Sequence, residues 1–231
     1  MRDTPSVIFE NARFLLVDKP EGWLSVPSRT GDADARACAG RWLERERGAR
    51  LFPCHRLDEP VSGLLLFALD ADAHRAANGW FEHGSVRKTY EALSEEPRAG
   101  HVPVGFDAPL PLPLAGREVT WESVLAKGKK RAFVNAAQGK RCVTRATLHS
   151  VDGGVLRWSL KPLTGRPHQL RFELYQRGSP ILGDALYGAQ KPWTQTGIAL
   201  RVFELDFAEC AGAVSLGLPA HVRVAGLDRP W

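Results

Sequence analysis

The sequence predicts an α+β fold with a mixed, mostly antiparallel sheet flanked by helices and loops. Segments with strand character outnumber helical ones, and they occur in hairpin-like groups without strict strand–helix alternation. The tripeptide Asp152-Gly153-Gly154 is a strong hairpin turn signal between two such segments. The sequence has no internal repeat, low-complexity tract or evident linker, so a single domain over residues 1–231 is expected.

Strands are expected where short apolar runs end at turn residues. They cover residues 14–20, 64–69, 88–93, 144–148, 155–160 and 198–207. Residues 97–113 are rich in Pro and Gly and predict a long loop. Residues 117–134 alternate polar and apolar side chains and carry a basic cluster, which favours extended structure there.

Three helices are predicted from apolar residues at helical spacing. The first covers residues 34–47, with Asp34 as N-cap and Gly48 as its end. The second lies around residues 73–81, with Asp70 or Asp72 as N-cap and Gly84 as terminator. The third runs from about Pro167 to Arg177, since proline is favoured in a first turn and Gly178 follows the last one.

Composition limits the class of protein. The chain has 231 residues, 44% hydrophobic and 25% charged, which is ordinary for a soluble globular protein. Its formal charge of +5 has the sign expected for a protein that binds a polyanion, but a mildly basic enzyme without a nucleic-acid partner is equally compatible. No segment resembles a signal peptide or a membrane span, and the four cysteines form no close pair. We therefore expect a cytoplasmic protein with reduced thiols.

Three polar clusters lie at the edges of apolar elements. They are His55-Arg56 with Asp58, Tyr90, and the segment 164–171. Each residue has a structural alternative: Asp58 can cap a turn, Tyr90 can be a core aromatic, and Arg171 can be a surface cation. Together they favour a site, because burying several such groups is costly unless they have partners. Arg171 can form a bidentate pair with a carboxylate and keep it ionised.

Competing chemistries are weakly supported. The histidines show no metal-ligand spacing, and the sequence has no Gly-x-Ser-x-Gly elbow, dinucleotide fingerprint or phosphate-binding Walker loop. We therefore expect neither a metal nor a cofactor. A hydrolase that uses Asp58 with His55 or His168 is a possible but poorly supported alternative.

In their order along the chain, these segments resemble the RluA family of RNA pseudouridine synthases. The resemblance extends over roughly residues 8–207. The matching stretches are 8–11, 16–22, 55–58, 62–64, 88–90, 139–140 with Thr144, 163–171 and 180–188. The stretches around Asp58 and Arg171 are long and ordered, so a chance match is not expected.

The resemblance implies cofactor-free isomerisation of uridine to pseudouridine in ribosomal or transfer RNA, in a cleft across the sheet. Asp58 matches the essential aspartate. Its role stays open among three: it can attack the base, attack the sugar or drive an elimination. Tyr90 matches the tyrosine that stacks on uracil, and Arg171 the basic partner of the aspartate. Arg56 matches the side chain that fills the gap left by the extruded nucleotide. The remaining expected substrate contacts are His55, Leu57, Arg166, His168 and Leu170.

Two departures from the family pattern are visible. Glu173 stands where the family often has a histidine, and because the catalytic pattern starts within the first ten residues, we expect no S4-type RNA-binding domain before it. RNA affinity is then expected to come from the catalytic domain itself, with the segment 117–141 as the loop that grips RNA. Separately, we expect a monomer. The basic side chains of this segment can neutralise phosphates; they are Lys127, Lys129, Lys130 and Arg131. The alternative is that the segment is a solvated basic hairpin without an RNA contact. A catalytically silent RNA-binding or ribosome-assembly protein on the same scaffold is the alternative function.

Overall fold

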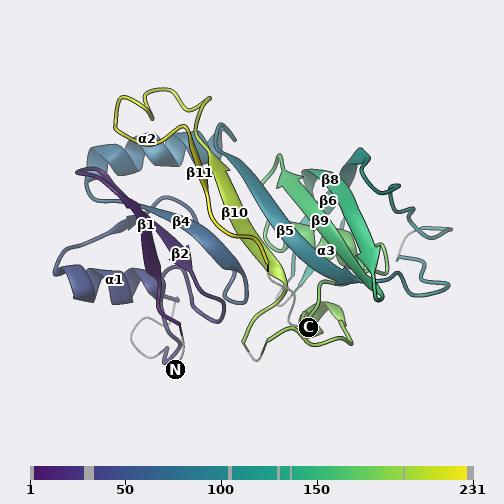
Figure 1. Ribbon diagram of the computed structural model, residues 1–231. Helices are drawn as coiled ribbons and strands as arrows, with labels where there is room; N and C mark the ends of the chain where they lie inside the picture. The colour runs from purple at the N-terminus through teal and green to yellow at the C-terminus, as the bar shows by residue number, and fades with distance from the viewer. Residues whose placement is uncertain are drawn as a thin grey trace. The chain divides into compact units, whose positions relative to one another are not determined.

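The computed structural model describes residues 3–28, 34–103, 106–128, 131–135, 137–194 and 196–227 (Figure 1). The chain divides into two compact units. The first consists of Met1–Lys88 with Val202–Ala225, and the second of Thr89–Arg201 with Gly226–Trp231. Both contain sheet strands and at least one helix, so the predicted α+β class is confirmed. The single domain over residues 1–231 stays a prediction.

The first unit contains a sheet with the strand order β1-β2-β4-β10. Short strands pair with two of these, β3 with β4 and β11 with β10. The bounds are β1 Ser6–Glu10, β2 Phe14–Lys19, β3 Phe52–Pro53, β4 Ser62–Ala68, β10 Leu200–Asp206 and β11 His221–Arg223. β1 pairs antiparallel with β2, and β2 pairs antiparallel with β4. β4 is buried along its whole length, as its continuous apolar sequence predicts.

Gly63 allows two of these strands to come close together. Its φ is 113°, and a Cβ atom there would collide with the backbone of Val202. Only glycine accepts this conformation at no steric cost. The start of β4, which follows the Asp58 loop directly, is therefore fixed against β10.

Helix α1 (Ala39–Arg47) packs on one face of the sheet in the first unit, where Leu43 meets Leu15 and Leu65 in a buried cluster. The helix starts later than predicted and its N-cap is Cys38, so the predicted cap at Asp34 is wrong. The Asp34 carboxylate instead binds the Arg36 side chain. Gly48 ends the helix in the left-handed conformation, as predicted.

Helix α2 (Ala71–Glu82) packs on the opposite face. Its Asp70 N-cap accepts hydrogen bonds from the backbone N–H groups of Asp72 and Ala73, which confirms one of the two predicted caps. Trp80 packs against Phe14, with ring centroids 5.9 Å apart. Phe14 and Leu15 are neighbours on β2 and face opposite sides, so the helices cover the two faces of these strands (Figure 1).

The second unit contains an antiparallel series in the order β5-β9-β8-β6-β7. The bounds are β5 Arg87–Glu95, β6 Glu118–Lys127, β7 Ala132–Val134, β8 Lys140–Asp152 and β9 Val155–Pro162. The predicted turn joins β8 to β9, and Gly153 and Gly154 both have positive φ values, 58° and 70°. This pair of conformations is what a tight hairpin requires.

Helix α3 (Gln169–Tyr175) contacts β9 and β7 in the second unit. It is shorter than the predicted helix from Pro167 to Arg177. His168 adopts a left-handed conformation with φ of 57°, so it cannot be part of the helix, which begins one residue later. A single 3₁₀ turn, η2 (Ala185–Tyr187), lies close to α3. In the part of the chain that the structure describes, no helix is long and apolar enough to cross a membrane.

Candidate active site

The backbone on both sides of Asp58 is fixed by hydrogen bonds within the first unit. The Leu57 N–H donates to the Ser25 hydroxyl, which in turn donates to the Leu57 carbonyl, both at 2.9 Å. On the other side, the Gly22 N–H donates to the Glu59 carbonyl at 2.9 Å. Asp58 lies between these two anchors and is half-buried. The segment after β2 thus holds the loop that carries this carboxylate.

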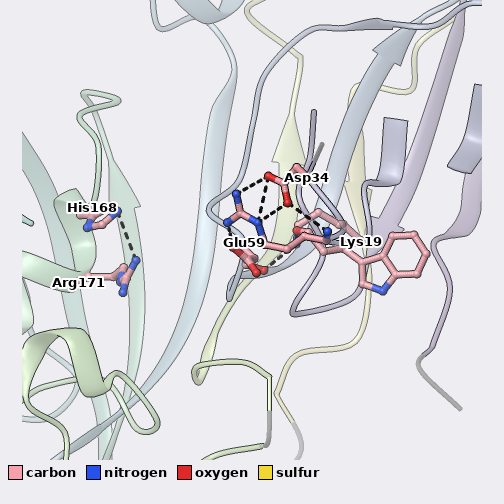
Figure 2. A network of polar contacts seen from close by, with 7 residues as sticks. Lys19, Asp34, Glu59, His168 and Arg171 are labelled. Carbon is pink, nitrogen blue, oxygen red and sulfur yellow. Dashed lines mark hydrogen bonds and ion pairs between the residues drawn. The ribbon is translucent and has the colours of Figure 1, made fainter. Parts of the chain in front are cut away.

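Lys19 adds a third anchor to the same loop (Figure 2). Its side chain is fully buried, and Nζ donates to the carbonyls of Pro20, Trp23 and Glu59 at 2.9, 2.8 and 3.3 Å. Burial lowers the pKa of Lys19 to about 7, and the negative charge of Asp58 is the largest influence that opposes this shift. The ammonium group therefore links the end of β2 to the Asp58 loop.

A charged network holds the Glu59 side chain at the surface (Figure 2). Arg36 Nη1 donates to Glu59 Oε2 at 2.6 Å, and Arg36 Nη2 donates to Asp34 Oδ2 at 2.6 Å. Hydrogen bonds from Arg36 hold the pKa of the Asp34 carboxyl well below its usual range. Because Arg36 is half-exposed, this network orients the Glu59 side chain more than it stabilises the fold.

His55 and its neighbours have contrasting environments. The His55 ring stacks on Phe81 with centroids 4.5 Å apart, and His55 Nε2 accepts a hydrogen bond from the Leu66 N–H at 3.1 Å. Burial, with a smaller effect of the Lys88 charge, lowers the pKa of His55 to about 3. His55 is therefore neutral and ties the loop to β4. Arg56 is exposed and Leu57 is buried, and substrate contact by these three residues stays a prediction.

Tyr90 lies in β5 of the second unit, opposite Leu160 of β9. Only 9% of its surface is exposed, and the preceding Thr89 is also buried. Its position in the middle of a paired strand fixes the backbone, so any motion of the ring is confined to its side-chain torsions. Stacking of Tyr90 on a base stays a prediction.

Gln169 organises the loop that leads into α3. Its Oε1 accepts hydrogen bonds from the Thr164 hydroxyl and the Arg166 N–H, and its Nε2 donates to the Val143 carbonyl and the Thr144 hydroxyl. All four bonds lie between 2.9 and 3.1 Å. One buried amide thus joins the loop to β8 and fixes the start of the helix.

Arg171 forms a buried bidentate ion pair with Asp184. Arg171 Nε and Nη2 donate to the two carboxylate oxygens at 2.6 and 2.8 Å, and both side chains are almost fully buried. Nη1 lies 3.5 Å from His168 Nε2 (Figure 2), and the guanidinium lies 5.3 Å from the centre of the Tyr187 ring. This geometry fixes the plane of the guanidinium. Sequence reasoning gave no role to Asp184 or Tyr187, although both lie in the matching stretch 180–188.

The other predicted contacts of this segment lie around Arg171. His168 Nδ1 is 3.1 Å from the Tyr187 hydroxyl, and Leu170 is buried at the start of α3. Arg166 Nε donates to the Arg141 carbonyl at 3.2 Å, which places its side chain beside β8. The structure therefore brings His168 close to Arg171, and it places Arg166 beside β8 and Leu170 in the interior. Their contact with a substrate stays a prediction.

Glu173 belongs to a separate buried network on α3. Its carboxylate pairs with Arg177 at 2.7 Å and accepts hydrogen bonds from Ser123 and Gln176. The Arg177 guanidinium lies 3.8 Å from the Trp121 ring centre, and burial lowers the pKa of Arg177. The departure at Glu173 therefore supplies half of a core ion pair.

The predicted RNA-gripping segment includes the β6–β7 hairpin. Lys127 is the last residue of β6 and is in register with Ala132. Arg131 is exposed, and its Nη1 lies 3.5 Å from the Leu186 carbonyl. Lys129 and Lys130 lie outside the described residues. Within the described ranges, no three His, Cys, Asp or Glu side chains are grouped so that they could hold a metal ion.

Comparison with known proteins identifies the class. A family model described as RNA pseudouridylate synthase matches residues 13–176. A dual-specificity RNA pseudouridine synthase RluA from Haemophilus influenzae is 31% identical over 78% of this chain and 76% of its own length. The tRNA pseudouridine synthase C of Salmonella typhi is 29% identical over 97% of this chain and 86% of its own.

A solved structure has the same fold. The human RNA pseudouridylate synthase domain containing 1 matches with a TM-score of 0.65 and 22% identity, over 100% of this chain and 93% of that one. With the family match, this defines an enzyme of the isomerase class. The chain belongs to the RluA family of RNA pseudouridine synthases.

Proposed function

We propose that the protein converts a uridine of a structured ribosomal or transfer RNA into pseudouridine without a metal or cofactor. Family membership and relatives named for RNA and tRNA support this proposal. In the reaction the N1–C1′ bond breaks, the uracil turns, and C5 bonds to C1′. C5 loses a proton and N1 gains one, so the product is an isomer. The balance requires no oxidant, reductant or co-substrate.

Asp58 is the proposed essential carboxylate. The observation that carries this assignment is the double anchoring of its loop, through Leu57 on one side and Glu59 on the other. A carboxylate that must meet one atom of an extruded nucleotide needs a backbone that does not move. The Lys19 ammonium group donates to the Glu59 carbonyl and adds a third contact that holds the same loop.

Tyr90 and Arg171 are the proposed partners in the reaction. Tyr90 stacks on the uracil, and Arg171 supplies positive charge to the anionic groups of the reaction. The bidentate contact with Asp184 supports this role, because it fixes the direction of the guanidinium before substrate binds. Arg56, which is exposed, occupies the gap left in the RNA by the extruded nucleotide.

RNA affinity is proposed to come from basic side chains in the segment 117–141, namely Lys127, Lys129, Lys130 and Arg131. Exposure of Arg131 on the β6–β7 hairpin supports this, since phosphate contacts need accessible cations. His55, Leu57, Arg166, His168 and Leu170 complete the proposed substrate contacts.

The decisive experiment replaces Asp58. RNA labelled with tritium at uridine C5, prepared from cells that lack the gene, is incubated with the wild type, Asp58→Asn and the control Asp72→Asn. Asp72 is an exposed carboxylate in α2 that pairs with Arg75. Tritium release by Asp58→Asn should fall by at least about 10³-fold, and Asp72→Asn should match the wild type. Near-normal release by Asp58→Asn would remove this residue from the mechanism. RNA binding without tritium release by the wild type would favour the silent RNA-binding alternative.

Tyr90→Phe tests the hydroxyl separately from the ring. The phenylalanine keeps the aromatic face, so RNA binding should stay unchanged. If the hydroxyl assists removal of the C5 proton, single-turnover product formation should slow by about 10- to 1,000-fold. An unchanged single-turnover rate would leave Tyr90 with stacking as its only role.

A further inference from the structure

The second unit contains a cavity of about 510 Å³ that the proposed chemistry does not use. It is lined by residues from α3, the β6–β7 hairpin, η2 and the loop at residues 101–103. Its volume is typical of sites for small organic ligands. The cavity is therefore large enough for a nucleobase with its sugar.

Aromatic rings make up much of the cavity wall. Phe133, Phe172, Tyr175 and Tyr187 all line it. The Tyr175 and Tyr187 centroids are 5.5 Å apart with their planes at 51°, and Phe172 lies 5.9 Å from Tyr175. The rings are inclined to one another, and Phe133, at 44% exposed, is the most accessible of the four. An aromatic wall of this kind suits a flat heteroaromatic ring, for which exposed Phe133 offers the stacking surface.

The rim of the cavity is unusually apolar for a protein surface. Val102, Phe133 and Val134 line the cavity and are 43%, 44% and 41% exposed. Single exposed apolar side chains are common, but a group of them around a cavity indicates a binding site.

Two buried polar atoms in the cavity-lining residues have no hydrogen-bond partner among the described residues. They are Gln176 Oε1 and His101 Nε2. Gln176 Nε2 donates to the Glu173 carboxylate at 2.7 Å, so the amide orientation is fixed and Oε1 remains an acceptor. Buried polar groups of this kind are costly unless a ligand or water satisfies them. Because Oε1 is itself buried, a ligand N–H would satisfy it only with a small shift of the neighbouring side chains of the cavity wall.

Two further features favour a nucleotide over an uncharged aromatic ligand. Arg131 lines the cavity, is exposed, and can contact a phosphate. Tyr187 also lines the cavity, and its ring lies 5.3 Å from the Arg171 guanidinium. The cavity thus shares a wall with the residues that surround Arg171.

We propose that this cavity binds a second, unmodified base of the RNA substrate, unpaired and distinct from the target uridine, with its phosphate at Arg131. The inference rests on the proposed function, since it takes RNA as the substrate. A base with an amino or imino N–H directed at Gln176 Oε1 meets the polar requirement, and the rings supply the stacking surface.

The test uses adenosine 5′-monophosphate as the probe and the full chain with ¹³C-labelled aromatic rings. Titrations are followed by NMR in the wild type, Asp58→Asn, Phe133→Ala, Gln176→Met and Leu114→Ala. Leu114 is 76% exposed and does not line the cavity, so it is the matched control. Ribose 5-phosphate and N-acetylphenylalanine amide serve as comparison ligands.

Saturable shifts should appear at His101, Phe133 and Tyr175, and ribose 5-phosphate should bind at least tenfold more weakly. Phe133→Ala and Gln176→Met should each weaken nucleotide binding at least fivefold, while Leu114→Ala has no effect. Equal binding of ribose 5-phosphate would overturn the proposal, because the base would then contribute nothing. Preference for the phenylalanine amide would overturn it in favour of an apolar peptide.

Two outcomes separate this inference from the proposed function. Asp58→Asn should bind the nucleotide as the wild type does, because the cavity does not contain Asp58. Nucleotide binding without pseudouridine formation by the wild type would support the cavity and contradict the proposed function. Pseudouridine formation without nucleotide binding in the cavity would contradict this inference alone.

Discussion

Lys19 illustrates how one buried cation can organise a loop through backbone carbonyls. An ammonium group has three hydrogens to donate, and Nζ has three carbonyl acceptors, on Pro20, Trp23 and Glu59. A neutral amine has only two. Loss of the proton therefore removes one of these three hydrogen bonds. The longest, to the Glu59 carbonyl at 3.3 Å, is the first that we expect to weaken, because that carbonyl keeps its bond from the Gly22 N–H.

This argument predicts an unusual titration for Lys19. In ¹³Cε-lysine NMR its signal should titrate near pH 7, whereas exposed lysines titrate near 10.5, because burial disfavours the ammonium form. Lys19→Met keeps the apolar stem but removes the donors, and it should slow pseudouridine formation. Lys161→Met, at a half-exposed lysine, is the control. A Lys19 midpoint near 10.5 would contradict this account.

At the scale of single elements, α3 separates two functions on neighbouring residues. Arg171 pairs with Asp184, whereas Glu173 pairs with Arg177 and accepts a hydrogen bond from Ser123. Residues two positions apart lie on different sides of a helix. The helix therefore presents one ion pair to the candidate site and uses another to attach itself to β6.

The second ion pair should contribute strongly to stability. Glu173→Gln leaves a buried guanidinium without its counter-charge, so the free energy of unfolding should fall by about 3 kcal/mol in urea titrations. Glu122→Gln, which removes an exposed partner of Arg141, should cost less than about 1 kcal/mol. The double variant Glu173→Gln with Arg177→Met should cost less than the sum of the single changes. Additive costs would mean that the two charges do not interact.

The elements also show where sequence reasoning succeeds. Apolar runs identified β2 and β4, and Asp70 was recognisable as an N-cap because its side chain precedes a helical apolar pattern. Asp34 has the same local signature, but its carboxylate binds Arg36, and the helix starts at Ala39. Arg36 is only two residues from Asp34, so both possible partners are local, and the sequence pattern alone cannot reveal which of them the carboxylate binds.

In the candidate site too, the sequence identified some of the residues and gave no role to others. The resemblance drew attention to Asp58 and Arg171 because long, ordered motifs surround them. Lys19 and Asp184 were part of matching stretches, yet no role followed from the sequence. Their significance depends on burial and on contacts with residues distant in sequence, such as Glu59 for Lys19. Such contacts are a product of the complete fold.

For the molecule as a whole, the net charge of +5 is smaller than the number of accessible cationic side chains, because several of them are offset by exposed carboxylates. Arg141 pairs with Glu122, and Arg145 lies 4.0 Å from Glu118, all with substantially exposed side chains. Exposed ion pairs of this kind are worth little in free energy. An RNA phosphate can therefore compete for these arginines without a large cost to the fold.

The stability of the whole molecule should also depend on pH through His55. Its pKa is about 3 in the folded protein and 6.5 in the unfolded chain, so the unfolded chain binds the proton first as the pH falls. The stability that comes from a neutral His55 is complete above pH 6.5 and is lost progressively towards pH 3. The slope from this one group is at most about 1.4 kcal/mol per pH unit.

His55→Gln removes this titration and keeps an acceptor for the Leu66 N–H, because Gln Oε1 lies near the position of His Nε2. The variant should be less stable than the wild type at pH 8, because it lacks the stacking contact with Phe81. Between pH 6.5 and 4, however, urea titrations should show the wild type losing stability more steeply than the variant. The difference in free energy of unfolding between the wild type and the variant should therefore become smaller as the solution becomes more acidic. Parallel curves over this range would mean that folded His55 titrates near its ordinary pKa and that its ring is open to water.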